Sequence, residues 1–175
     1  MNPIRSIKGT HDILPVDSHN WQTLESIVRK ICARFGYNEI RTPVFEETRL
    51  FSRSVGEETD IVSKEMYSWE DKDGTSLTLR PELTASVVRS FIQHNLGRQA
   101  PLQRLYYMGP LFRRERPQKG RQRQFHQFGI EAFGSENPEQ DAEIIAIAWH
   151  ILDECGLRKE AMLQLNSIGS PKCRL

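Results

Sequence analysis

LYYMGPLFRRERPQKGRQRQFHQFGIEAF, residues 105–133, consists of two apolar, aromatic-rich runs on either side of a basic stretch. Residues 105–112 and 124–133 have the composition of β-strands, and a proline and a glycine supply bends between them. The segment therefore predicts a β-hairpin with a basic loop, residues 113–123. That loop holds six Lys or Arg and one Glu, a net charge of +5, whereas the whole chain of 175 residues carries +1.

The sequence before this hairpin predicts a long helix and a short strand. Apolar residues recur at helical spacing from Asp17 or Ser18, either of which suits an N-cap, to a stop at Gly36. Residues 37–42 follow as a short β-rich run that ends at Pro43, which has no N–H to donate. A helix that leads into a strand is expected here.

Further strands and helices follow the same kind of pattern. Residues 66–70 and 75–80 are β-rich and are joined by a DKDG turn, which predicts an antiparallel hairpin. Residues 84–94 are expected to be helical. The pair Asn137 and Pro138, with a glutamine three residues after the asparagine, marks the start of a helix that ends before a glycine. Residues 162–165 are expected to form a last strand.

These elements predict one α+β domain in which helices flank a mainly antiparallel sheet. Hydrophobic residues make up 38% of the chain, and a length of 175 residues suits about one domain. The longest apolar run, residues 144–149, is far shorter than the ~18 residues that span a bilayer, and the N-terminus lacks an apolar signal segment. We expect a soluble, cytoplasmic protein that is not bound to a membrane.

The basic loop has two interpretations. Guanidinium groups at strand ends can hold phosphate oxygens bidentately, which indicates a phosphate-rich ligand. A run of charge can also be a solvated surface loop, and composition does not separate the two. A G-x-x-x-x-G-K loop, a serine or cysteine nucleophile motif and a metal-ligand spacing of His or Cys are all absent from the sequence. No metal ligand is therefore predicted among the residues of this chain.

Alternation along the second strand of the hairpin sends side chains to two faces. Gln127, Gly129 and Glu131 share one face, and Phe128 and Ile130 share the other. An amide and a carboxylate suit a ligand with an amine or imidazole N–H, and the glycine would leave room between them. The alternative is that this face is merely solvated.

Three further polar side chains have a structural interpretation. His126 is expected opposite Gln127, as a packed rather than a ligating residue. In LRPELTA, residues 79–85, Glu82 can hold an ammonium group, or Glu82 and Thr84 can cap the helix that follows.

These motifs resemble the histidyl-tRNA synthetase family, a class II aminoacyl-tRNA synthetase family, over nearly the whole chain. KGT at residues 8–10 resembles the opening of the family, and GYNEI at residues 36–40 with Pro43 resembles its motif 1. FRRERP at residues 112–117, followed by FHQ, resembles motif 2, for which RPQKGRQRQFHQ is highly specific. The resemblance implies that residues 1–175 are an incomplete class II catalytic domain, with motifs 1 and 2 but without motif 3 and the anticodon-binding domain.

The resemblance also implies a reaction and its partners. The reaction is ATP-dependent activation of L-histidine to histidyl-adenylate, followed by transfer to tRNA(His), with Mg²⁺ as cofactor and a homodimer formed through motif 1. Because the histidine carboxylate attacks the α-phosphorus directly, no protein nucleophile is needed. The resemblance implies that Arg113 is the catalytic residue on the α-phosphate and that Glu115, Arg121 and Phe125 bind other parts of ATP. It implies that Glu82, Thr84 and Gln127 bind the histidine ammonium and that Glu131 binds the imidazole. It also implies that Arg116 and Gln118 contact the tRNA acceptor end.

Two other functions compete with this one. A non-catalytic, histidine-sensing paralogue, similar to the regulatory subunit of ATP phosphoribosyltransferase, would have the same fold, but the complete motif 2 favours the synthetase. A plain RNA-binding module would explain the basic loop but not the polar set of Glu82, Gln127 and Glu131. One residue departs from the family pattern: Leu83 stands where many relatives have glycine. Two interpretations are open, a reshaped pocket rim or a tolerated variant, and we favour the tolerated variant.

Overall fold

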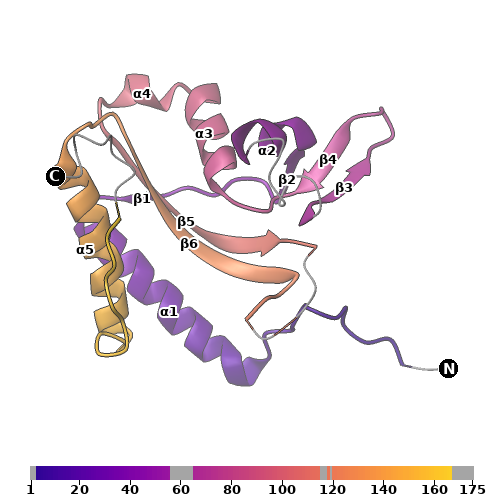
Figure 1. Cartoon of the computed structure of the whole chain (residues 1–175), viewed down its shortest axis with the longest axis horizontal. Helices are drawn as coiled ribbons and strands as arrows, with labels where there is room; N and C mark the ends of the chain where they lie inside the picture. The colour runs from indigo at the N-terminus through magenta and orange to yellow at the C-terminus, as the bar shows by residue number, and fades with distance from the viewer. Residues whose placement is uncertain (1–2, 56–64, 115–117, 119, 167–175) are drawn as a thin grey trace.

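The computed structural model describes residues 3–55, 65–114, 118 and 120–166 (Figure 1). In chain order, its elements are α1 (Pro15–Arg34), β1 (Asn38–Glu39), β2 (Phe45–Glu47), α2 (Thr48–Val55), β3 (Tyr67–Glu70), β4 (Ser76–Leu79), α3 (Thr84–Gln93), α4 (Leu96–Gln99), β5 (Gln103–Phe112), β6 (Gln124–Phe133) and α5 (Pro138–Glu154). None of the helices in these ranges is long and apolar enough to cross a membrane.

The strands form two separate three-stranded sheets. β5 and β6 pair antiparallel along their whole length, from Gln103 opposite Phe133 to Phe112 opposite Gln124, and β1 adds a short parallel pairing to β5. The second sheet has the order β2-β4-β3 and is antiparallel throughout. Both predicted hairpins are confirmed, and so is the α+β class with a mainly antiparallel sheet flanked by helices.

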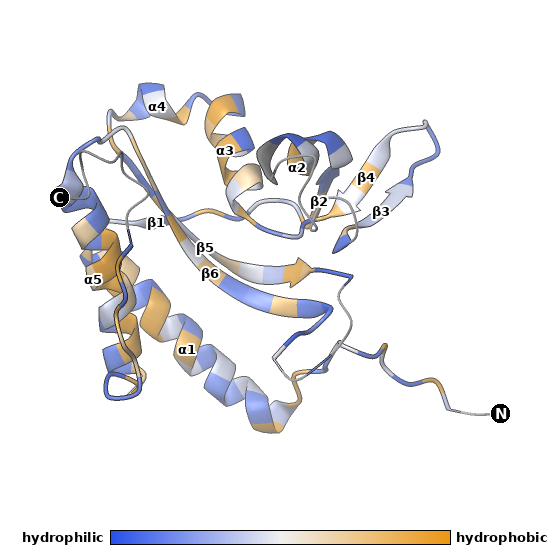
Figure 2. Cartoon of the chain, in the orientation of Figure 1, coloured by the Kyte–Doolittle hydropathy of each residue, from blue (hydrophilic) through white to orange (hydrophobic). Residues whose placement is uncertain are grey.

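The two faces of the β5–β6 hairpin are covered differently. α1 and α5 lie together against one face (Figure 1), and their apolar stripes are visible in Figure 2. A core cluster forms there from Val28 and Ile31 of α1, Tyr106 of β5, and Ile147 and Ile151 of α5. On the other face, α3 supplies Val87 to a second cluster with Leu83, Leu105, Tyr107 and Leu111. The hairpin is therefore the layer between two cores.

Several predicted boundaries differ from the structure. α1 begins at Pro15 rather than at Asp17 or Ser18, because proline at the first helical position already has a helical φ. Residues 37–42 contain a strand only at 38–39; beyond it, the carbonyls of Thr42 and Pro43 accept hydrogen bonds from a side chain instead of a strand.

The strand expected at residues 162–165 is wrong, because no described strand pairs with these residues and Met162, Leu163 and Leu165 are exposed. The helix at Asn137 and Pro138 is confirmed. Its glutamine, however, does not cap the helix: Gln140 is buried and donates to the Tyr37 hydroxyl at 2.7 Å.

Candidate active site

One face of β6 carries the polar side chains that alternation predicts. Phe128 and Ile130 pack against the α1–α5 cluster, so Gln127, Gly129 and Glu131 lie on the opposite face. His126 faces α1, where its ring lies 4.5 Å from that of Trp21, although the residue remains exposed. The alternation of β6 therefore separates packing side chains from polar ones.

Arg113 directly follows β5 and lies beside Phe125. Its guanidinium carbon is 5.2 Å from the centroid of the Phe125 ring, and its Nε donates to the Pro81 carbonyl at 3.0 Å. Its backbone N–H donates to the Arg123 carbonyl at 3.0 Å, which closes the hairpin at the base of the basic loop. The Arg113 side chain thus contacts both the Phe125 ring and the corner before α3.

The corner before α3 places Glu82 and Thr84 together. One carboxylate oxygen of Glu82 accepts the Ala85 N–H at 2.9 Å, so the capping interpretation describes what Glu82 does in this structure. A carboxylate has further lone pairs, and capping leaves acceptor sites for a ligand. Thr84 is exposed, and its hydroxyl oxygen is 3.3 Å from that of Tyr107.

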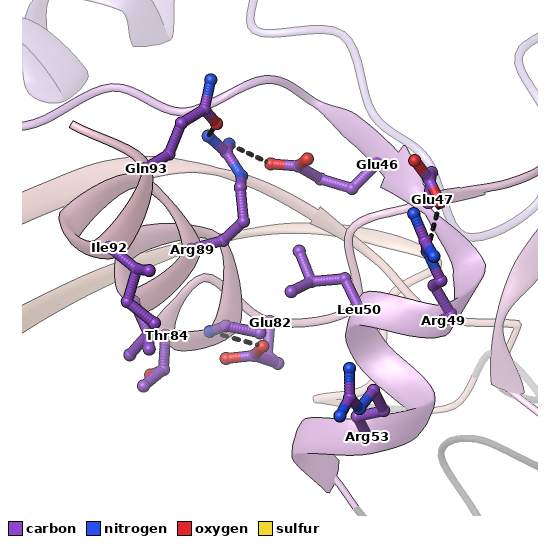
Figure 3. Close-up of a pocket in the computed structure, with 12 residues that line it drawn as sticks. Glu46, Glu47, Arg49, Leu50, Arg53, Glu82, Thr84, Arg89, Ile92 and Gln93 are labelled. Carbon is purple, nitrogen blue, oxygen red and sulfur yellow. Dashed lines mark hydrogen bonds and ion pairs between the residues drawn. The ribbon is translucent and has the colours of Figure 1, made fainter.

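A cavity of about 730 Å³ opens between α2 and α3, next to this corner (Figure 3). Its apolar wall includes Leu50, Val88 and Ile92, and ion pairs of Arg89 with Glu46 and of Arg49 with Glu47 border it. Glu82 and Thr84 both line it. Gln127, by contrast, lines a second cavity of about 540 Å³ beside β5 and α1.

Leu83 does not stand at the rim of the α2–α3 cavity. Its side chain is 2% exposed and packs with Val87, Leu105 and Leu111 in the second core cluster. Leu83 instead lines the second cavity, together with Gln127.

Tyr107 is a site residue that the sequence analysis missed. Its hydroxyl donates to Glu131 Oε1 at 3.1 Å, and its ring crosses Gly129, where a Cβ would lie 2.3 Å from it. Burial raises the pKa of Tyr107 to about 12. The glycine therefore makes room for a tyrosine of the neighbouring strand rather than for a ligand. The sequence did show a glycine between two polar residues. It did not show the strand register that pairs this glycine with Tyr107.

Arg80 was also missed, and it joins the two sheets. It is buried, and its guanidinium donates to the carbonyls of Pro110 and Thr42, both at 2.9 Å, and of Pro43 at 3.2 Å. Burial lowers its pKa. At position 109, a Cβ would lie 2.5 Å from its Nη2, so glycine leaves room for the guanidinium there. Arg80 thereby sets where the corner with Glu82 and Thr84 lies relative to β5.

The basic loop is described only in part. Glu115 and Arg116 lie outside the described residues. Gln118 and Arg121 are exposed and form a tight turn in which the Arg121 N–H donates to the Gln118 carbonyl at 2.9 Å. The Gly9 carbonyl accepts the N–H groups of Arg123, at 2.7 Å, and of Gln124, at 3.1 Å, so the N-terminal arm is held against the loop.

Two sheets joined at such a corner, with an arginine, an amide and a carboxylate on one hairpin face, form a core of the class II aminoacyl-tRNA synthetase kind. A family model described as histidyl-tRNA synthetase matches residues 9–169. The chain belongs to the histidyl-tRNA synthetase family.

Relatives with curated names agree with this family. The chain is 56% identical over 171 residues to a histidine–tRNA ligase of Solibacter usitatus, which covers 98% of this chain and 41% of that protein. It is 57% identical over 164 residues to a histidine–tRNA ligase of Geobacillus kaustophilus, with 93% and 38% covered. The chain thus spans about two fifths of the length of these relatives.

Solved structures have the same fold. The crystal structure of apo S. aureus histidyl-tRNA synthetase matches with a TM-score of 0.75 and 44% identity, over 89% of this chain and 36% of that one. A structure titled ATP phosphoribosyltransferase regulatory subunit/histidyl-tRNA synthetase, from Bacillus halodurans, matches with a TM-score of 0.74 and 26% identity, over 89% and 40%.

Proposed function

We propose that this chain is part of a histidine–tRNA ligase, which activates L-histidine with ATP and transfers the histidyl group to tRNA(His). In this proposal, residues 1–175 form the part of the catalytic domain that contains motifs 1 and 2. The observation that supports it most is the shared hairpin face, on which Arg113 and Phe125 lie in contact and Glu131 follows along the same strand.

Activation of histidine needs charge stabilisation and positioning. The carboxylate of histidine attacks the α-phosphorus of ATP, and pyrophosphate leaves. Arg113 would stabilise the negative charge that develops on the α-phosphate, because a preorganised cation stabilises this transition state more than the ground state. With the Phe125 ring 5.2 Å away, a nucleotide bound at Arg113 has an aromatic surface for its base within reach.

Mg²⁺ belongs to this proposal as an ion carried by ATP. Within residues 3–55, 65–114, 118 and 120–166, no three His, Cys, Asp or Glu side chains are grouped as metal ligands. We assign the ion to the phosphates of ATP. When bound, it would add positive charge at the phosphates.

Recognition of histidine would use hydrogen-bond acceptors at both ends of the amino acid. Glu82, Thr84 and Gln127 are assigned to the α-ammonium group, and Glu131 to an imidazole N–H. The contact of Thr84 and Glu131 with one tyrosine hydroxyl supports a single binding region for these two residues.

The remaining contacts are proposed from motif 2 and motif 1. Glu115 and Arg121 are assigned to ATP, and Arg116 and Gln118 to the acceptor end of tRNA(His), which salt should weaken. A homodimer with an isologous contact through residues 19–43, in the cytoplasm, completes the proposal.

A hybrid enzyme tests this function. The chain replaces the segment that it matches in the Geobacillus kaustophilus histidine–tRNA ligase, and exchange of pyrophosphate into ATP is measured with and without L-histidine, followed by aminoacylation of tRNA(His). Exchange that requires histidine is expected. Histidine binding without any exchange would instead support the non-catalytic sensor, and RNA binding that ignores histidine would support an RNA-binding module.

A further inference from the structure

We propose that Tyr107 is a positioning residue for the amino acid. Its hydroxyl orients the hydrogen bonds of Thr84 and Glu131 so that both residues present lone pairs to a ligand that donates hydrogen bonds from both of its ends. This inference rests on the proposed function, since the ligand it describes is histidine. The inference follows from the two hydrogen bonds that the Tyr107 hydroxyl makes with other described residues.

The Tyr107 hydroxyl lies between the two groups. Its oxygen is 3.1 Å from Glu131 Oε1 and 3.3 Å from Thr84 Oγ1. Tyr107 is 4% exposed, so its hydroxyl has little access to water as an alternative partner. Thr84 at the start of α3 and Glu131 on β6 are thereby linked through a single residue of β5.

The chemistry of the three groups determines the direction of both hydrogen bonds. An ionised carboxylate only accepts, so the single proton of the tyrosine goes to Glu131. The tyrosine oxygen can then only accept from Thr84, which donates its own proton to it. As a result, the outward lone pairs of Thr84 and the second oxygen of Glu131 are acceptors.

Two features keep this arrangement in place. Burial holds the pKa of Tyr107 at about 12, so the hydroxyl keeps its proton at physiological pH. The ring lies over Gly129, where a Cβ would come within 2.3 Å of it, so the ring depends on glycine at that position. Burial and the space above Gly129 therefore hold Tyr107 in an orientation that reaches both partners.

The resulting site favours a particular chemical class of ligand. It offers acceptors to an ammonium group and to a ring N–H. An amino acid whose side chain lacks an N–H would leave the second oxygen of Glu131 without a hydrogen-bond partner, which costs more than the loss of one favourable contact. Tyr107 thus contributes to specificity without being required to touch the ligand.

The test compares Tyr107→Phe with a matched control in the hybrid enzyme. The control is Tyr106→Phe, because Tyr106 is also 4% exposed and its hydroxyl also donates to a carboxylate, that of Glu39 at 3.3 Å, but on the opposite face of the hairpin. For each protein, KM values for histidine and ATP, kcat for exchange and the thermal midpoint are measured. Exchange is also measured with thiazolylalanine, which lacks the ring N–H.

Tyr107→Phe is expected to raise the KM for histidine about tenfold, which is the loss of a hydrogen bond of ordinary strength, and to leave the KM for ATP within about twofold. The preference for histidine over thiazolylalanine should shrink, whereas Tyr106→Phe should retain it. If both variants change the two KM values alike, or if Tyr107→Phe retains the full preference, the inference is overturned.

A second variant and a binding measurement keep the test decisive. Gly129→Ala leaves the hydroxyl in the chain but displaces the ring, and it should reproduce the effect on the KM for histidine. If Tyr107→Phe does not fold, an unchanged KM for histidine in Gly129→Ala overturns the inference. If the wild-type hybrid binds histidine but does not exchange, the ligase proposal fails and Tyr107 is judged on the Kd for histidine; if it does not bind histidine, both proposals fail.

Discussion

The two faces of the β5–β6 hairpin use neighbouring residues for different purposes. Tyr106 points towards α1 and α5, packs near Val28 and Ile31, and donates to Glu39. Tyr107 points the other way, and its hydroxyl links the corner before α3 to Glu131. Both are almost fully buried, so burial alone does not distinguish the packing face from the candidate active-site face.

The difference lies in what covers each face. Two long helices cover the packing face, which leaves its apolar side chains in a continuous core. On the other face, α3 and the corner before it meet only part of the hairpin, and charged and amide side chains accompany the apolar ones. A substitution on the first face should therefore change stability, and one on the second should change ligand kinetics.

Arg113→Ala in the hybrid enzyme is expected to have the largest effect on this second face. Loss of the guanidinium removes about 3 kcal/mol of transition-state stabilisation, which is a loss of roughly 100-fold or more in kcat for exchange. The exposed Arg98 of α4 supplies the control, since Arg98→Ala should leave exchange unchanged. Normal exchange in Arg113→Ala would remove this residue from the mechanism.

Ile147→Ala tests the packing face. Ile147 is 0% exposed, and its truncation leaves a cavity that should destabilise the fold by about 3 kcal/mol. The expected result is a lower thermal midpoint with unchanged KM values for histidine and ATP in the enzyme that remains folded. A selective change in the KM for histidine would contradict the separation of the two faces.

Glu131→Gln sharpens the comparison within the active-site face. The amide accepts less strongly than a carboxylate, so the KM for histidine should rise by about tenfold, an effect of about 1.4 kcal/mol. The KM for ATP should change much less, because ATP is assigned to Arg113 and Phe125. Equal changes in both KM values would argue against the contact with the imidazole.

The smallest expected effect is a pH dependence on the packing face. Although His126 is exposed, partial desolvation of its ring beside Trp21 lowers its pKa below the usual 6.5, an effect that Glu25 partly opposes. The unfolded chain therefore takes up the proton first, so the contribution of His126 to stability is complete above about pH 6.5 and is lost as the pH falls through the folded pKa. His126→Gln should flatten the change in thermal midpoint between pH 7.5 and pH 5; an unchanged slope would contradict it.

Elements with a strong local signal were predictable. The period of two along residues 124–133 and the Asn137–Pro138 start both depend on neighbours in sequence, and the structure has each of them where expected. β2 and α2 were not predicted, because β2 is only three residues long and is held by its pairing with β4, some thirty residues away. Residues 162–165 show the converse, since this β-like run has no partner strand among the described residues and is irregular.

The sequence alone determined which residues can share a face, because alternation in a strand is a local property of the backbone. It therefore placed Gln127, Gly129 and Glu131 together. Only the tertiary structure decided what each of them meets. The antiparallel register sets Tyr107 across Gly129, and buried Arg80 joins carbonyls 30 and 38 residues away in the chain. Such contacts depend on the packing of distant segments, for which no short pattern in the sequence is a guide.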